Sequence, residues 1–138
     1  MRRWTILVLP LLLASAAACG SNEANVGPES NPSKKGTDLT VSVTAKPGAQ
    51  PRTWTLTCEP TGGDHPEAAK ACASLASAKH PFEPTPKHQM CTQIYGGPEK
   101  ATIKGTWQGE KVSATYSRKN GCEIHRWNAI KPVLNQRS

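Results

Sequence analysis

The chain has 138 residues, a formal net charge of +7 and an aromatic content of 5%. Such a length allows one ordinary domain and excludes an assembly of several. The basic side chains are dispersed without interleaved aromatic residues, which indicates a solvated surface and predicts no nucleic-acid partner. Examples are Lys100, Lys104, Lys111, Arg118 and Lys119.

The first 18 residues have the layout of an export signal. Met1, Arg2 and Arg3 give a basic start, and the apolar run from Trp4 to Ala18 ends in small residues. That run is shorter than the roughly 20 residues that a membrane-spanning helix needs. We predict a signal peptide over residues 1–18 and an exported protein.

Cys19 follows this signal directly. The segment from Ala16 to Ser21 resembles the lipobox of bacterial lipoproteins, in which the cysteine becomes the lipid-modified first residue, although Leu usually stands where this chain has Ala16. The chain has five cysteines, and assigning Cys19 to a lipid leaves an even four. We predict a lipoprotein on the outer face of the cell membrane, with a secreted protein cut near Ala18 as the alternative.

Residues 19–36 are predicted to be a linker that follows the lipidated cysteine. From Gly20 to Gly36 the segment has almost no apolar side chain, so burial cannot offset the entropy lost on ordering it. The folded domain is therefore expected over residues 37–138.

Two strands are expected at the start of this domain. Apolar and polar residues alternate from Leu39 to Thr44 and again from Thr53 to Cys58, the period of half-buried strands. Between them, the segment from Lys46 to Pro51 carries the Pro and Gly residues of a turn. The two segments are predicted to be neighbouring strands.

One helix is predicted from about Pro66 to about Lys79. Proline suits a first helical position, and Asp64 or His65 is a candidate cap. The helix must end before the proline cluster that begins at Pro81, since proline does not continue a helix. This cluster leads to a segment from Met90 to Tyr95 that we expect to be an exposed loop.

Two further strands are expected from Ala101 to Gln108 and from Lys111 to Tyr116, joined around Gly109. Strands combined with a helix on one face make an α+β domain. The four cysteines of this domain allow three disulfide pairings, and the sequence alone does not choose among them.

No enzyme signature is present. The chain lacks G-x-S-x-G, H-E-x-x-H, the phosphate loop and the closely spaced cysteines of zinc sites. Its histidines are dispersed, at His65, His80, His88 and His125. We predict no catalytic residue, no metal and no cofactor.

Five short motifs together resemble the Streptomyces subtilisin inhibitor family of serine protease inhibitors, over about Leu39 to Glu123. They are Thr55-Leu56-Thr57-Cys58, Gly62-Gly63-Asp64-His65-Pro66, Ala71-Cys72, Met90-Cys91-Thr92-Gln93-Ile94-Tyr95 and Gly105-Thr106-Trp107-Gln108-Gly109. The resemblance implies a small antiparallel β-sheet of about five strands with one or two short helices. It also implies two disulfides, Cys58 with Cys72 and Cys91 with Cys122.

The same resemblance implies a function and a reactive bond. It places the bond offered to a subtilisin-like or trypsin-like serine protease between Gln93 and Ile94, inside the loop pinned by Cys91. Gln93 would fill the primary specificity pocket of the protease, with Met90, Thr92 and Tyr95 as flanking contacts. Members of the family are commonly homodimers, so a homodimer is expected.

Several residues depart from the family pattern. Gln93 stands where Met, Leu, Lys or Arg is usual, and Gly96-Gly97 stands where the family's strand normally resumes after an acidic residue and proline. Glycine raises backbone freedom, so the trailing side of the loop is expected to be less ordered. The resemblance also ends after Cys122. These departures favour an alternative function, a non-inhibitory, membrane-tethered binding module for a protein or an anionic cell-wall polymer.

Overall fold

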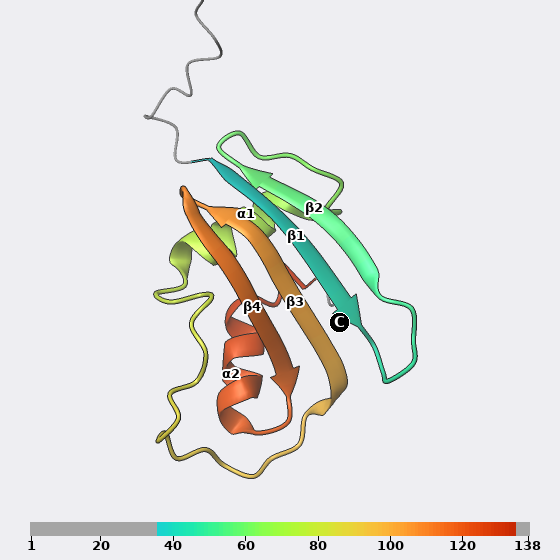
Figure 1. The fold of residues 1–138 in the computed structure, drawn as a ribbon, viewed down its shortest axis with the longest axis vertical. Coiled ribbons are helices and arrows are strands. Elements are labelled where there is room, and N and C mark those ends of the chain that lie inside the picture. The colour runs from blue at the N-terminus through green and yellow to red at the C-terminus, as the bar shows by residue number, and fades with distance from the viewer. Residues whose placement is uncertain (1–35, 135–138) are drawn as a thin grey trace, which may run out of the picture. The chain divides into compact units, whose positions relative to one another are not determined.

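The computed structural model describes residues 36–134. Its elements are β1 (Thr37–Thr44), β2 (Arg52–Cys58), α1 (Ala68–Ser77), β3 (Gly97–Trp107), β4 (Glu110–Arg118) and α2 (Gly121–Ala129). The strands form an antiparallel sheet in the order β2-β1-β3-β4, and both helices lie on one face of it (Figure 1). The predicted α+β class is confirmed, with two disulfides.

Two hairpins build the sheet. β3 and β4 are joined by Gln108 and Gly109, whose φ angles of 48° and 85° are both positive, as a two-residue turn between twisted strands requires. β1 and β2 are joined by a longer turn, in which the Ala49 N–H donates to the Lys46 carbonyl oxygen at 3.0 Å. Both predicted strand pairs are therefore confirmed.

The core lies between the sheet and the helices. The alternation predicted from Leu39 to Thr44 holds, because Leu39 and Val41 are fully buried while Thr40 is exposed. Val41 faces Ile103 across the β1–β3 pair, and Ile103 is also fully buried. One face of each strand thus packs on the helices, as the period of two along a strand requires.

The chain after Cys122 closes this core. Trp127 lies on α2, and only 1% of its surface is exposed. Three residues beyond the helix are fully buried: Ile130, Val133 and Leu134. The Nε2–H of His65, itself buried, donates to the Val133 carbonyl oxygen at 2.8 Å. The C-terminal segment is therefore part of the domain and fastens the entrance of α1.

The described residues contain four strands rather than the expected five. Past β4 the chain forms α2, because the Asn120 side chain accepts a hydrogen bond from the Glu123 N–H at 3.0 Å and caps the helix. Glu123 in the first turn and Arg126 in the last turn suit the helix dipole. These local signals favour a helix over a further strand.

The first helix is shorter than predicted, Ala68–Ser77 instead of 66–79, and neither candidate cap serves it. Asp64 instead accepts hydrogen bonds from the backbone N–H and the hydroxyl of Thr55 on β2. These bonds hold the pKa of the Asp64 carboxyl below its usual value. His65 Nδ1 accepts the Glu67 N–H at 3.1 Å, so it orders the helix entrance without capping the helix.

The predicted signal peptide, the lipidation of Cys19 and nearly all of the linker fall on residues 1–35, outside the described part of the chain. Neither helix within residues 36–134 is long and apolar enough to cross a membrane.

Replacing Leu134 with Ala should destabilise the domain by about 3 kcal/mol, because the change leaves a cavity in a fully buried site. Urea unfolding of the purified protein measures the effect. The exposed Asn128 on α2 provides the matched control, and Asn128→Ala should change stability by no more than about 0.5 kcal/mol. Equal effects of the two changes would contradict the role assigned to the C-terminal segment.

Candidate functional site

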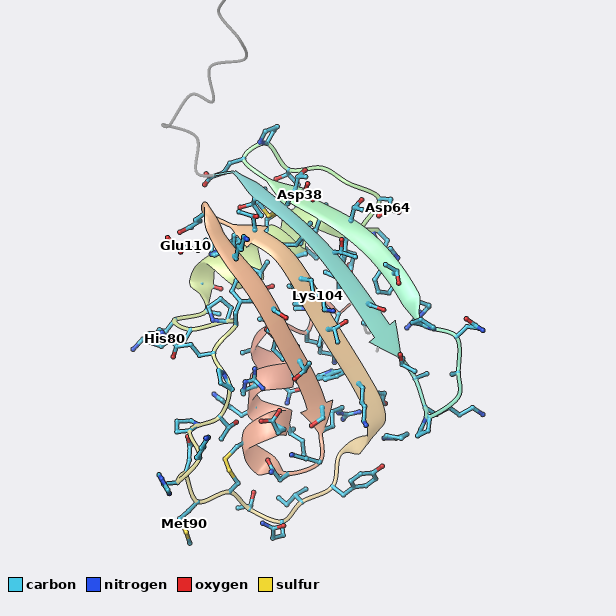
Figure 2. The ribbon with its side chains drawn as sticks, in the orientation of Figure 1. Asp38, Asp64, His80, Met90, Lys104 and Glu110 are labelled. Atoms are coloured by element: carbon cyan, nitrogen blue, oxygen red, sulfur yellow. A yellow bond between two sulfur atoms is a disulfide. The ribbon has the colours of Figure 1, made fainter. Side chains whose placement is uncertain are left out.

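The long connection between α1 and β3, residues 78–96, ends in an exposed apex. Met90, Ile94 and Tyr95 have 95%, 58% and 69% of their surface exposed. They are the exposed large hydrophobic residues of the described part of the chain. Met90 lies at one end of the molecule with its side chain directed away from the sheet (Figure 2). Apolar side chains gathered at an exposed site mark a surface for a partner.

Two contacts hold the chain as it approaches the apex. The hydroxyl of Tyr116 on β4 donates to the Pro81 carbonyl oxygen at 2.6 Å, and the Thr85 hydroxyl donates to Glu123 Oε1 at 2.7 Å. Burial raises the pKa of Tyr116, so its hydroxyl keeps the proton that it donates. Glu123 is itself held by Arg126 at 2.9 Å. Sheet and helix therefore both position this part of the loop.

Cys91 and Thr92 are fixed to the start of α2. A disulfide joins Cys91 to Cys122, with their Cα atoms 5.4 Å apart. Next to it, the Gly121 N–H donates to the Thr92 carbonyl oxygen at 2.9 Å. A Cβ atom on Gly121 would collide with the Thr92 hydroxyl. The Thr92 side chain therefore occupies space that is open because residue 121 has no side chain.

The chain is attached again three residues after Gln93, where the Gly96 N–H donates to the Arg118 carbonyl oxygen at 2.7 Å. Gln93, Ile94 and Tyr95 lie between the two attachments, and all three are exposed. The side-chain amide of Gln93 donates to the Cys91 carbonyl oxygen at 3.2 Å. The peptide bond between Gln93 and Ile94 thus lies within an exposed segment that is held at both ends.

The structure brings the six predicted loop residues, Met90 to Tyr95, together at this apex. It pairs Cys58 with Cys72 and Cys91 with Cys122, the arrangement that the resemblance implies. The sequence analysis missed the residues that hold the loop in place, namely Thr85, Tyr116, Arg118, Gly121 and Glu123. Gly121, directly before Cys122, is the one local signal that could have indicated that another part of the chain approaches closely there.

The described residues hold no group of three or more His, Cys, Asp or Glu side chains placed to bind a metal ion. His65 is buried in the core, whereas His80, His88 and His125 are exposed.

These features define a class of protein, a small disulfide-linked α+β domain that presents an ordered peptide segment to a partner. The family model described as "Subtilisin inhibitor-like" matches residues 33–120. The chain belongs to this family, whose named relatives are protease inhibitors.

Individual relatives carry the same description. The chain is 34% identical over 83 residues to subtilisin inhibitor-like protein 1 of Streptomyces cacaoi, which covers 56% of this chain and 74% of that protein. It is 37% identical over 86 residues to the subtilisin inhibitor of Streptomyces albogriseolus, which covers 60% of this chain and 59% of that protein.

Among solved structures, the chain is similar to Streptomyces caespitosus sermetstatin in a crystal structure with Bacillus licheniformis subtilisin. The TM-score is 0.47 at 21% sequence identity, and the match covers 73% of this chain and 99% of that one.

Replacing Gly121 with Ala should force the exposed Thr92 side chain into a less favourable rotamer and destabilise the domain by about 1 kcal/mol. The loss should be smaller in a Thr92→Ala background, because the colliding hydroxyl is then gone. Urea unfolding of the four proteins of this double-mutant cycle gives the coupling energy, which we expect to be on the order of 1 kcal/mol. Additive effects would show that Thr92 does not rest on Gly121.

Proposed function

We propose that this protein is an exported inhibitor of a subtilisin-like or trypsin-like serine protease and acts as a substrate mimic through Gln93 and Ile94. The observation that carries the proposal is the exposed segment from Gln93 to Tyr95, held on one side through Thr92 and on the other through Gly96. A protease can reach the Gln93–Ile94 peptide bond from outside without unfolding the loop.

Ordering before binding explains why such a segment would inhibit. A flexible peptide loses conformational freedom when a protease binds it, and a segment already held in place avoids much of that loss. After attack, the attachments keep the two new chain ends close together. Proximity of this kind strongly favours re-formation of the bond over release of the ends.

Each residue of the apex has a role in this proposal. Gln93 enters the primary specificity pocket, Ile94 and Tyr95 lie on the leaving side, and Met90 reaches a more distant apolar cleft, to which its flexible side chain can adapt. The Gln93 amide must leave the Cys91 carbonyl oxygen and find new hydrogen-bond partners in the pocket, since a buried amide without partners costs about 1–3 kcal/mol. A target pocket with polar lining therefore suits this chain.

We further propose that Cys19 carries the lipid that holds the protein at the membrane. Four of the five cysteines are joined in disulfides, which leaves Cys19 as the fifth. Mass spectrometry of detergent-extracted protein should show an acylated N-terminal cysteine. A homodimer, proposed from the family resemblance, is tested by analytical ultracentrifugation.

Titration of the purified protein against subtilisin and trypsin, with mass spectrometry of the mixtures, tests the inhibitory function. Stoichiometric inhibition with slow, single cleavage between Gln93 and Ile94 is expected. Rapid digestion at several bonds, or no binding, would contradict inhibition and favour the non-inhibitory binding module.

Replacing Gln93 should change which protease the protein inhibits most strongly. Gln93→Met should lower the inhibition constant for subtilisin by about 10- to 200-fold, and Gln93→Lys should do the same for trypsin, because the new side chain fits the respective pocket. Steady-state inhibition assays measure both constants.

The matched controls are Gln89→Met and Gln89→Lys, since Gln89 is an exposed glutamine outside the segment from Gln93 to Tyr95. They should leave both constants nearly unchanged. If neither Gln93 variant lowered its inhibition constant, Gln93 would not be the residue that enters the pocket.

A further inference from the structure

Two glycines, Gly96 and Gly97, form the corner through which the loop enters β3. Gly97 has a φ of 143°, which glycine adopts without the steric conflict that other residues meet. A Cβ atom on Gly96 would lie 2.9 Å from the side chain of Ile124 and 3.2 Å from Cβ of Arg118. A Cβ atom on Gly97 would collide with the carboxylate of Glu99. The glycines thus allow other side chains to close over this corner.

Arg118, the last residue of β4, holds the corner in two ways. Its carbonyl oxygen accepts the Gly96 N–H at 2.7 Å, and its Nη1 lies 3.1 Å from Oε1 of Glu99. The two side chains are 25% and 23% exposed, so solvent screens this ion pair less than one on the open surface. The register of β3 against β4 shifts between Gly97 and Lys100, which places Glu99 in the irregular part of the ladder.

This ion pair is poorly arranged as a source of stability. Oε2 of Glu99 and Nε of Arg118 are buried, and neither has a hydrogen-bond partner among the described residues. Polar atoms buried without partners cost free energy, and a partly buried ion pair is weak evidence for a stabilising role. Its position points to a role in the loop, because Glu99 follows Ile94 by only five residues in the chain.

The two sides of the Gln93–Ile94 bond are held by different means. On the Gln93 side, the Cys91–Cys122 disulfide is a covalent attachment close to the bond. On the Ile94 side, the attachment is the Gly96 hydrogen bond to the Arg118 carbonyl oxygen. The Glu99 carboxylate lies against the adjacent Gly97 and pairs with the Arg118 side chain. We propose that Glu99 and Arg118 are positioning residues that hold the leaving segment in place after cleavage. This inference rests on the proposed inhibitory function.

The reaction shows why the position of that segment matters. In cleavage, the serine oxygen of the protease bonds to the Gln93 carbonyl carbon and gives up its proton, the C–N bond to Ile94 breaks, and the Ile94 nitrogen takes up that proton. Water can then attack the same carbon, the serine oxygen leaves and regains a proton, and the cleaved form ends in a Gln93 carboxylate. In the reverse step, the Ile94 amine attacks the same carbon, the serine oxygen leaves, and the proton returns to the protease. The amine can attack only if it stays near the acyl carbon, so a loosened corner should favour the cleaved form.

Glu99→Gln tests the proposal, because it removes the charge while keeping the size of the side chain. Each protein is incubated with a catalytic amount of subtilisin until the ratio of cleaved to intact chain is constant, and mass spectrometry measures that ratio. We expect an increase of about tenfold over the unchanged protein, since a looser end gains more freedom on cleavage. Glu99→Gln combined with Arg118→Gln should raise the ratio similarly and leaves no unpaired charge behind.

Glu67→Gln is the matched control, because Glu67, directly before α1, pairs with Lys70 of that helix at 2.8 Å and lies outside the loop. It should leave the ratio unchanged. Thermal unfolding followed by circular dichroism checks that all variants are folded at the assay temperature. If Glu99 and Arg118 only stabilised the fold, the ratio of cleaved to intact chain would not change in folded variants. An unchanged ratio in both Glu99 variants would overturn the positioning role alone. Failure of the unchanged protein to be cut singly at Gln93–Ile94 would overturn the inhibitory function and this inference together.

Discussion

The disulfide between Cys91 and Cys122 makes the exposed loop depend on the core. Cys91 belongs to a segment without helix or strand, and Cys122 lies in the first turn of α2. α2 is in turn fixed through the buried Trp127 and through the residues that follow it, up to Leu134. A change deep in the core can therefore shift the exposed segment from Gln93 to Tyr95, although the two do not touch.

Exposing the apex has an energetic cost that the rest of the fold must offset. Burial of a Met or Ile side chain contributes about 1.5–3 kcal/mol, and Met90 and Ile94 forgo much of this contribution in the free protein. A protease surface that covers these side chains would recover it on binding. In the proposed function, the apolar apex would therefore provide affinity, and the attachments beneath it would provide order.

Gly96 and Gly97 illustrate how a local rule is overridden by tertiary contacts. Their sequence predicts a loose trailing side, because glycine has the greatest backbone freedom in an isolated chain. In the structure the absence of side chains lets Ile124 and Arg118 approach closely, and the corner becomes an attachment point. The same residues that weaken a free peptide therefore permit close packing in the folded domain.

The sequence by itself determined the features that depend on local patterns. Alternation along Leu39 to Thr44, the turn at Gly109 and the proline cluster before Met90 gave the hairpins and the loop, because strand period and proline geometry act over a few residues. Only the tertiary structure decided that the segment after α2 closes the core, that Asp64 bonds to Thr55 instead of capping α1, and that Glu99 and Arg118 brace the loop. These contacts join residues far apart in the chain, and no periodicity or spacing encodes which distant partner a side chain will meet.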